Sequence, residues 1–160
     1  MKLFPYCQHT LHTSLSQVQV YEQLYSHTLR NQPLSPFLRP LEYFCGVVQW
    51  DSFRINHTIR GKRNSFSPQI RGSIHADDSG TRLNLSLALH PTTERFLKFY
   101  LVAVMSFILL GAVGCLAKKE MPLAFFLCPL FMGIFAIVLT HISFQEGCKD
   151  ALRFLDQILQ

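Results

Sequence analysis

Two long apolar runs near the end of this 160-residue chain limit what it can fold into. The 19 residues from Phe99 to Ala117 carry no charge, and the 23 residues from Pro122 to Phe144 are apolar but for three polar residues near the end. About 20 apolar residues in a helix cross a hydrocarbon core of ~30 Å. A chain of this length could hardly bury two such helices in a soluble domain. The sequence therefore predicts transmembrane helices at 96–117 and 122–144, joined by a turn at 118–121.

The short turn makes the two helices an antiparallel hairpin, so both ends of the chain are expected on one side of the membrane. Four cations flank the hairpin on that side and two lie at the turn: Arg95, Lys98, Lys149 and Arg153 against Lys118 and Lys119. The positive-inside rule therefore favours both termini in the cytoplasm. Small residues in both runs, among them Gly111 and Gly133, would let the helices approach closely.

Before the hairpin the sequence predicts a soluble α+β domain over residues 1–95. Several segments there alternate apolar and polar residues, which is typical of half-buried strands. Ser16 and Gln19 match the capping box that begins a helix. The expected elements are a strand at 2–15, a helix at 17–30, and strands at 42–50, 52–60, 69–76 and 81–90. Asp77-Asp78-Ser79-Gly80 is expected to form the turn between the last two strands.

After the hairpin, residues 145–160 carry an apolar stripe, made of Cys148, Ala151, Leu152, Leu155, Ile158 and Leu159. The charges opposite this stripe are nearly balanced, whereas a helix lying on a membrane usually carries mostly Lys and Arg. We therefore expect an amphipathic C-terminal helix that packs on the soluble domain. The expected fold is an α+β membrane protein: a small antiparallel sheet with one or two packing helices, plus a two-helix transmembrane hairpin. Its order of elements is similar to the helix-grip arrangement.

Residue types that carry chemistry are scattered along the chain. The five cysteines (Cys7, Cys45, Cys115, Cys128 and Cys148) contain no C-x-x-C pair, so neither a zinc site nor a disulfide framework is expected. His9 and His12 would point to opposite faces of a strand, which argues against a metal site. No nucleophile with a paired base can be named. The sequence therefore predicts no catalytic residues, no metal and no cofactor, and a protein that is not an enzyme.

Positive charge is concentrated before the hairpin, with 11 Lys and Arg against 6 acids up to Lys98. A basic domain held at a membrane faces anionic lipid headgroups, which is sufficient to explain this bias. No aromatic-interleaved basic motif supports nucleic-acid binding. The densest cations lie between the strands at 52–60 and 69–76, in a stretch without the glycine pattern of a phosphate loop. We take it as the candidate interaction or headgroup loop: Arg60, Lys62, Arg63, Asn64, Ser65, Phe66 and Pro68.

Several motifs run through the chain: Phe44-x-Gly46-x-Val48, Phe53-Arg54-Ile55, Asn64-Ser65-Phe66-x-Pro68-x-Ile70-x-Gly72-x-Ile74, Gly80-Thr81 and Leu89-His90-Pro91. With these motifs the chain resembles an uncharacterised family of small two-span bacterial membrane proteins, best represented among cyanobacteria. The resemblance implies two spans and a bacterial inner or thylakoid-type membrane. It brings no established activity, and so it assigns no functional residues.

Two functions remain open from the sequence. The first is a non-enzymatic integral membrane protein whose cytoplasmic domain is an interaction, accessory or assembly module, with a membrane protein or a second copy of itself as partner. The alternative is a membrane-anchored module that binds a lipid or another apolar ligand under the tail helix, with Arg54, Arg71 or the basic loop meeting a headgroup. A transporter or channel subunit is disfavoured, because the spans contain almost nothing polar to line a path.

Overall fold

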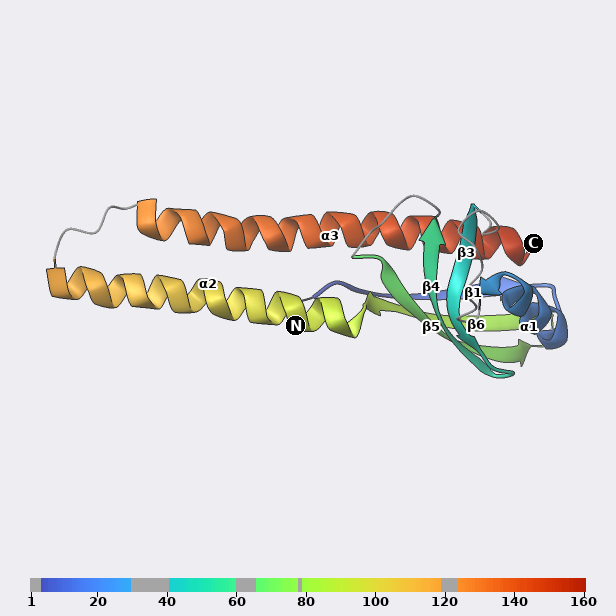
Figure 1. Ribbon diagram of the computed structural model, residues 1–160. Helices are drawn as coiled ribbons and strands as arrows, with labels where there is room; N and C mark the ends of the chain where they lie inside the picture. Colours follow the sequence, from blue (N-terminus) through green and yellow to red (C-terminus); the bar gives the residue numbers. More distant parts are fainter. Residues whose placement is uncertain (1–3, 30–40, 60–65, 78, 119–123) are drawn as a thin grey trace. The chain divides into compact units, whose positions relative to one another are not determined.

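The computed structural model describes residues 4–29, 41–59, 66–77, 79–118 and 124–160 (Figure 1). The chain forms two compact units, and the first of them is discontinuous in sequence. It combines Met1–His90 with Ser143–Gln160, and it contains a β-sheet with its packing helices. The second unit, Pro91–Ile142, contains the apolar helices. In the described residues the protein is therefore α+β, with three helices, two of them long and apolar.

The sheet of the first unit has six strands in the spatial order β1-β6-β5-β4-β3-β2. Their bounds are β1 (Tyr6–Thr13), β2 (Thr28–Leu29), β3 (Glu42–Val48), β4 (Ser52–Ile59), β5 (Pro68–Asp77) and β6 (Gly80–Leu89). All neighbours are antiparallel except β2 and β3, which run parallel. The sheet is therefore mixed, and the prediction of a purely antiparallel sheet is wrong at β2.

The same short strand corrects the predicted helix at 17–30. Helix α1 (Gln17–Ser26) begins at the expected capping box, in which the side chains of Ser16 and Gln19 each bond the other residue's backbone N–H. It ends earlier than predicted because His27 leaves the helix, and its carbonyl accepts the backbone N–H of Phe44 at 2.9 Å. The chain then joins the sheet edge at Thr28. A tertiary contact with β3 thus overrides the local helical pattern.

The strand register puts the apolar residues of five strands on one face, here called the inner face. Leu83, Leu87, Ile70, Ile55 and Phe44 are cross-strand neighbours or near neighbours on it, and each is fully buried. Val20 and Leu24 of α1 are also fully buried, and the Thr81 hydroxyl donates to the carbonyl of Leu15 at 2.7 Å just before α1. Helix α1 therefore covers part of the inner face.

Helix α3 (Ala124–Ile158) is a single helix, whereas the sequence predicted two helices, at 122–144 and 145–160. Pro129 lies inside α3 near its start, where the loss of one backbone hydrogen bond is the main cost. Gly147 is the only weak helix former where the predicted break would fall, and one glycine costs only ~1 kcal/mol. The helix therefore continues from the apolar run into the amphipathic tail.

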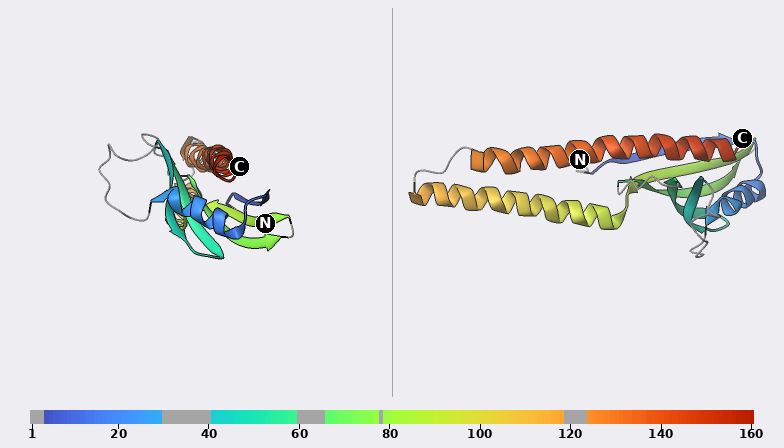
Figure 2. Two further views of the ribbon diagram at one scale, coloured as in Figure 1. Left: turned by 90° about the vertical axis from the view of Figure 1, so that its right-hand side faces the viewer. Right: turned by 45° about the horizontal axis from the view of Figure 1, so that its top comes forward.

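The tail of α3, from Ser143 onward, packs on the inner face of the sheet. The Phe154 ring lies 5.1 Å from the Phe44 ring, and the His27 ring at the end of α1 meets the Phe154 ring edge-on at 6.3 Å between centroids. The Thr13 hydroxyl of β1 donates to the carbonyl of Leu159 at 2.8 Å. The last turns of α3 lie beside the sheet in both views of Figure 2. Helix α1 and the tail of α3 thus share the inner face.

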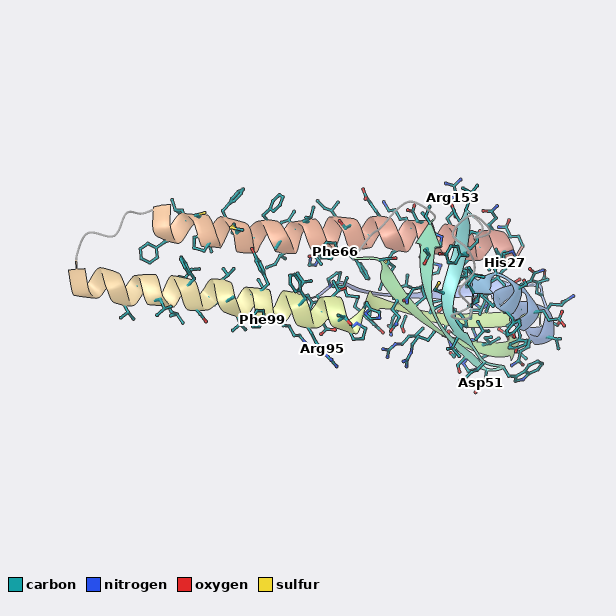
Figure 3. The ribbon with its side chains drawn as sticks, viewed as in Figure 1. His27, Asp51, Phe66, Arg95, Phe99 and Arg153 are labelled. Carbon is teal, nitrogen blue, oxygen red and sulfur yellow. The ribbon has the colours of Figure 1, made fainter. Side chains whose placement is uncertain are left out.

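The second unit holds helix α2 (Pro91–Lys118) and the first part of α3. Both helices are long and apolar enough to cross a membrane. Their large apolar side chains are exposed, for example Phe99 at 74% (Figure 3) and Leu110 and Phe131 at 70%. A methyl group added at Gly133 would lie 3.4 Å from Cγ1 of Val104, so Gly133 faces α2. Of the predicted turn, residues 119–121 lie outside the described part of the chain.

Candidate functional site

The face of the sheet opposite the helices, here called the outer face, is the open one. Neither α1 nor the tail of α3 covers it, since both pack on the inner face. Many of its side chains are polar and exposed, among them Gln8, Thr10, His12, Arg54, Arg71, His75, Arg82 and Asn84. Tyr43 and Gln69 are its buried members. The outer face is therefore where this unit can meet a ligand or a partner.

Two arginines form the centre of this face. Arg54 of β4 and Arg71 of β5 are direct cross-strand partners. They line a hollow of about 460 Å³, together with Val47, Gln49, Ser52, Phe53 and Gly72. This is the arginine pair referred to below. Pockets for small ligands usually have volumes of ~300–1,000 Å³, so the hollow has the size of a binding site.

A buried glutamine holds one guanidinium group of the pair. Gln69 is 8% exposed, and its Oε1 atom accepts from Nε and Nη2 of Arg71 at 3.4 and 3.2 Å. Gln69 therefore holds the guanidinium group of Arg71 in one orientation. The N–H donors of Arg71 that do not bond Gln69 point away from it. Arg54 is exposed and forms no ion pair or hydrogen bond with another described side chain.

The acid at the end of β5 lies beside an arginine and a histidine of this face. Asp77 Oδ2 lies 3.8 Å from Nε of Arg82 and 4.0 Å from Nδ1 of His12. Within the described residues, neither arginine of the pair forms an ion pair. The outer face thus contains one arginine that has an acidic neighbour, and two that share a hollow with each other.

Two close backbone approaches shape the strands that carry the pair. The Phe53 ring lies across Gly72 of the neighbouring strand, where a Cβ atom would overlap the ring and lie 2.8 Å from Cε2. A Cβ at Gly46 would overlap the backbone carbonyl of Arg54 and lie 2.8 Å from Cα of Ile55. Only glycine fits at these two positions, and both glycines are next to residues that line the hollow.

A second polar cluster lies at the inner face, where it is packed within the protein core. The His57 side chain is 4% exposed, with Nε2 3.6 Å from Oε2 of Glu42. Its ring packs against Phe44 and Phe154, with centroids 5.7 and 5.2 Å away. A hollow of about 200 Å³ beside it is lined by Glu42, Ile59, Asp150, Arg153 (Figure 3), Phe154 and Gln157. In the sequence, His57 has the spacing of an ordinary inward strand residue, and nothing there distinguishes it.

Most of the predicted interaction loop, Arg60 to Ser65, lies outside the described residues. Phe66 is half-buried just before β5 (Figure 3). Pro68 is fully buried where β5 begins, and it pairs with Leu89. The arginine pair was not part of the predicted interaction loop, but Arg54 and Arg71 were each named in the alternative function as a residue that could meet a headgroup. The signal of the pair in the sequence is weak, namely one arginine at an outward position in each of two alternating strands.

Groups that bind metals do not come together in the described ranges. His9 pairs with Leu85 on the inner face and His12 with Arg82 on the outer face, so they lie on opposite faces as predicted. No group of three or more His, Cys, Asp or Glu residues in the described part of the chain is placed to hold a metal ion. The arrangement that the structure does offer is a cationic recognition surface.

Comparisons with known proteins leave the family open. No protein-family model matches the chain, and no curated protein matches it. The resemblance to small two-span bacterial membrane proteins therefore stays a prediction.

Proposed function

We propose that the protein is a non-enzymatic integral membrane protein, anchored by a hairpin of α2 and the apolar part of α3. The sheet domain acts as an interaction, accessory or assembly module at the cytoplasmic surface of a bacterial inner or thylakoid-type membrane. Its partner is a membrane protein or a second copy of the chain, and anionic lipid headgroups lie nearby. Both termini are cytoplasmic.

The exposed apolar helices support the anchor. Soluble proteins rarely expose apolar patches larger than a few hundred Å², because water disfavours them. Here large apolar side chains are exposed along both helices, including Val102, Leu109, Leu130, Phe135 and Val138. A lipid bilayer is the environment in which this exposure carries no cost. The excess of cations at the chain-terminal end of the hairpin supports the orientation.

The contrast between the two faces of the sheet carries the proposal of an interaction module. Inner-face side chains such as Ile55, Leu87, Ala151 and Leu155 have no exposed surface at all. No water-sized void therefore borders them, and their packing resembles that of an ordinary protein core. The hollow of about 200 Å³ at the edge of this interface has a mostly polar lining and is smaller than the usual ~300–1,000 Å³ of a ligand pocket, which argues against the alternative, a lipid or apolar ligand held between sheet and tail helix. The outer face is therefore the surface that we propose to bind the partner.

Photo-crosslinking in native membranes tests the proposal. A benzophenone amino acid is placed at Asn84, which is exposed on the outer face, or at Asp156, which is exposed on the tail of α3. We expect a discrete protein adduct from position 84 and none of the same mass from position 156. Native mass spectrometry of the chain, extracted in a mild detergent, should give the stoichiometry of that adduct.

Two results would count against the proposal. Identical or absent protein adducts at both positions would remove the outer face as an interaction surface. Release of the chain from membranes by alkaline carbonate would remove the anchor, because a helix hairpin that spans the bilayer resists such extraction.

A further inference from the structure

The arginine pair is unfavourable as it stands, because two like charges face each other on adjacent strands. Like charges directly opposite in an antiparallel pair destabilise a sheet. Arg54 and Arg71 are such a pair, and within the described residues no carboxylate forms an ion pair with either of them. The neighbouring Arg82 does have an acid, Asp77. A local arrangement that costs stability without a structural gain is a mark of a functional site.

The geometry fits a ligand that brings its own negative charge. A guanidinium group presents five N–H donors in a planar fork that matches the oxygens of phosphate. Gln69 holds Arg71 through two contacts to Nε and Nη2, so part of that fork is fixed before a ligand arrives. Fixing a donor in advance lowers the entropic cost of binding. Arg54, which is freer, can close on the same anion from the neighbouring strand.

The walls of the hollow indicate a group larger than a bare ion. Its volume of about 460 Å³ exceeds what a single inorganic phosphate needs. Val47, which is 52% exposed, adds an apolar wall, and Gln49 and Ser52 add polar groups at the end of the β3–β4 hairpin. A phosphate ester, with a charged end and a small organic part, matches this combination.

We infer that the arginine pair binds the phosphate group of a phosphate ester, with Arg54 and Arg71 as its two cationic ligands. This inference rests on the proposed function, in that it takes the outer face as the binding surface. The phosphate comes either from a lipid headgroup or from a small soluble ester, and these two sources share the same recognition chemistry.

Titration of the purified full-length protein in a neutral detergent tests this inference. The probes are inorganic phosphate, glycerol 3-phosphate and short-chain phosphatidic acid, and the readouts are calorimetry and the NMR signals of arginine Nε–H groups. We expect saturable binding that shifts the Arg54 and Arg71 signals. Binding should weaken with added salt, and also below about pH 6, where a phosphate monoester loses its second charge.

Three variants identify the ligands. Arg54→Gln and Arg71→Gln should each raise Kd by about tenfold or more, since each removes a charge-assisted hydrogen bond. Arg82→Gln removes the same charge from the same face and should change Kd less than about twofold, because of its distance from the hollow and its own acid. Without phosphate, Arg54→Gln should unfold at the same or a higher temperature than wild type, since it relieves the repulsion.

The outcomes separate the sources and decide the inference. Tighter binding of phosphatidic acid than of glycerol 3-phosphate, lost in both pair variants, assigns a lipid headgroup, whereas equal binding assigns a soluble ester. Absence of saturable binding of all three probes would overturn the inference, and so would an equal loss in Arg82→Gln. No protein partner takes part in this assay. A negative binding result would therefore leave the crosslinking result at position 84 unaffected, and a negative crosslinking result would leave the binding result unaffected.

Discussion

The Phe53 ring packs on Gly72 of the neighbouring strand, and this contact requires that residue 72 has no Cβ atom. An aromatic side chain that covers a glycine of the next strand fixes the register and protects the exposed backbone. Phe53 is 4% exposed, so the ring has little freedom to move away. A Cβ atom at position 72 would overlap it.

Gly72→Ala should therefore lower the free energy of unfolding by about 1–3 kcal/mol, the usual cost of overpacking. The matched control is Ser73→Ala, one residue away on the other face, which should stay within about 0.5 kcal/mol of wild type. Chemical denaturation followed by circular dichroism measures both. Equal stability of the two variants would mean that the ring does not occupy the space over Gly72.

Cys148 is a thiol that should stay protonated. Burial raises its pKa from the ordinary value of 9.0 to about 12, and the nearby Cys7 thiol adds to the shift. Cys148 lies in the tail of α3 that packs on the sheet, beyond the apolar run that ends at Phe144. Because the pKa is higher in the folded state, the thiol's contribution to stability is complete below about pH 9 and is lost as the pH rises towards 12.

We expect iodoacetamide at about pH 8 to modify Cys45, which is partly exposed, well before Cys148, since the thiolate is the reactive form. Peptide mass spectrometry gives the extent of labelling at each position. In denaturant the two cysteines should react at similar rates. Equal rates in the folded protein would contradict the buried position of Cys148.

At the scale of elements, the tail of α3 is part of the core of the sheet unit. Leu155 and Ala151 are fully buried, whereas Asp156 is exposed on the same helical turn. Leu155→Ala should cost about 2–5 kcal/mol, the range for a buried leucine that leaves a cavity. Asp156→Ala should cost less than about 0.5 kcal/mol. The two variants can be compared by thermal unfolding, and similar losses would show that the tail is not packed as described.

Alternation with a period of two was the reliable signal for the elements. It predicted the strands that became β4 to β6 with small errors at their ends, whereas β3 was predicted from a short apolar run. Asp77 and Gly80, the two ends of the predicted turn, are paired. Strand β2 could not be predicted, because its two residues continue a helical pattern and only the bond from Phe44 to His27 draws them into the sheet. The unbroken α3 was missed because the change in composition after Phe144 resembles an element boundary.

The candidate site depended on register, which the sequence does not show. Arg54 and Arg71 could each be assigned to a polar face from alternation alone. That they are direct partners follows from the length of the connection between β4 and β5 and from the pairing that it permits. The sequence indicates the basic loop by three cations within four residues, and it indicates Arg54 and Arg71 only singly, whereas their direct pairing becomes visible when the strands are aligned.

For the whole molecule, the division into two units predicts that the sheet domain folds without the apolar helices. A chain of residues 1–90, joined by a flexible Gly/Ser linker to residues 143–160, should be soluble and should unfold cooperatively. Residues 1–90 alone should aggregate, because the surface that Ala151 and Leu155 cover would be exposed. Size-exclusion chromatography and circular dichroism would test both chains. A soluble, cooperatively folded 1–90 chain would contradict the role given to the tail.

The discontinuity of the sheet unit also sets an order of events during synthesis. The strands leave the ribosome first, but the segment that completes their core, Ser143–Gln160, is made last. At ~5–20 residues per second, the inner face waits several seconds for its cover. The apolar helices emerge during that interval, so in the proposed membrane protein insertion would precede completion of the sheet domain. Insertion would then act as a checkpoint in biogenesis: a chain whose hairpin fails to insert exposes two apolar surfaces at once, which marks it for chaperones and proteases.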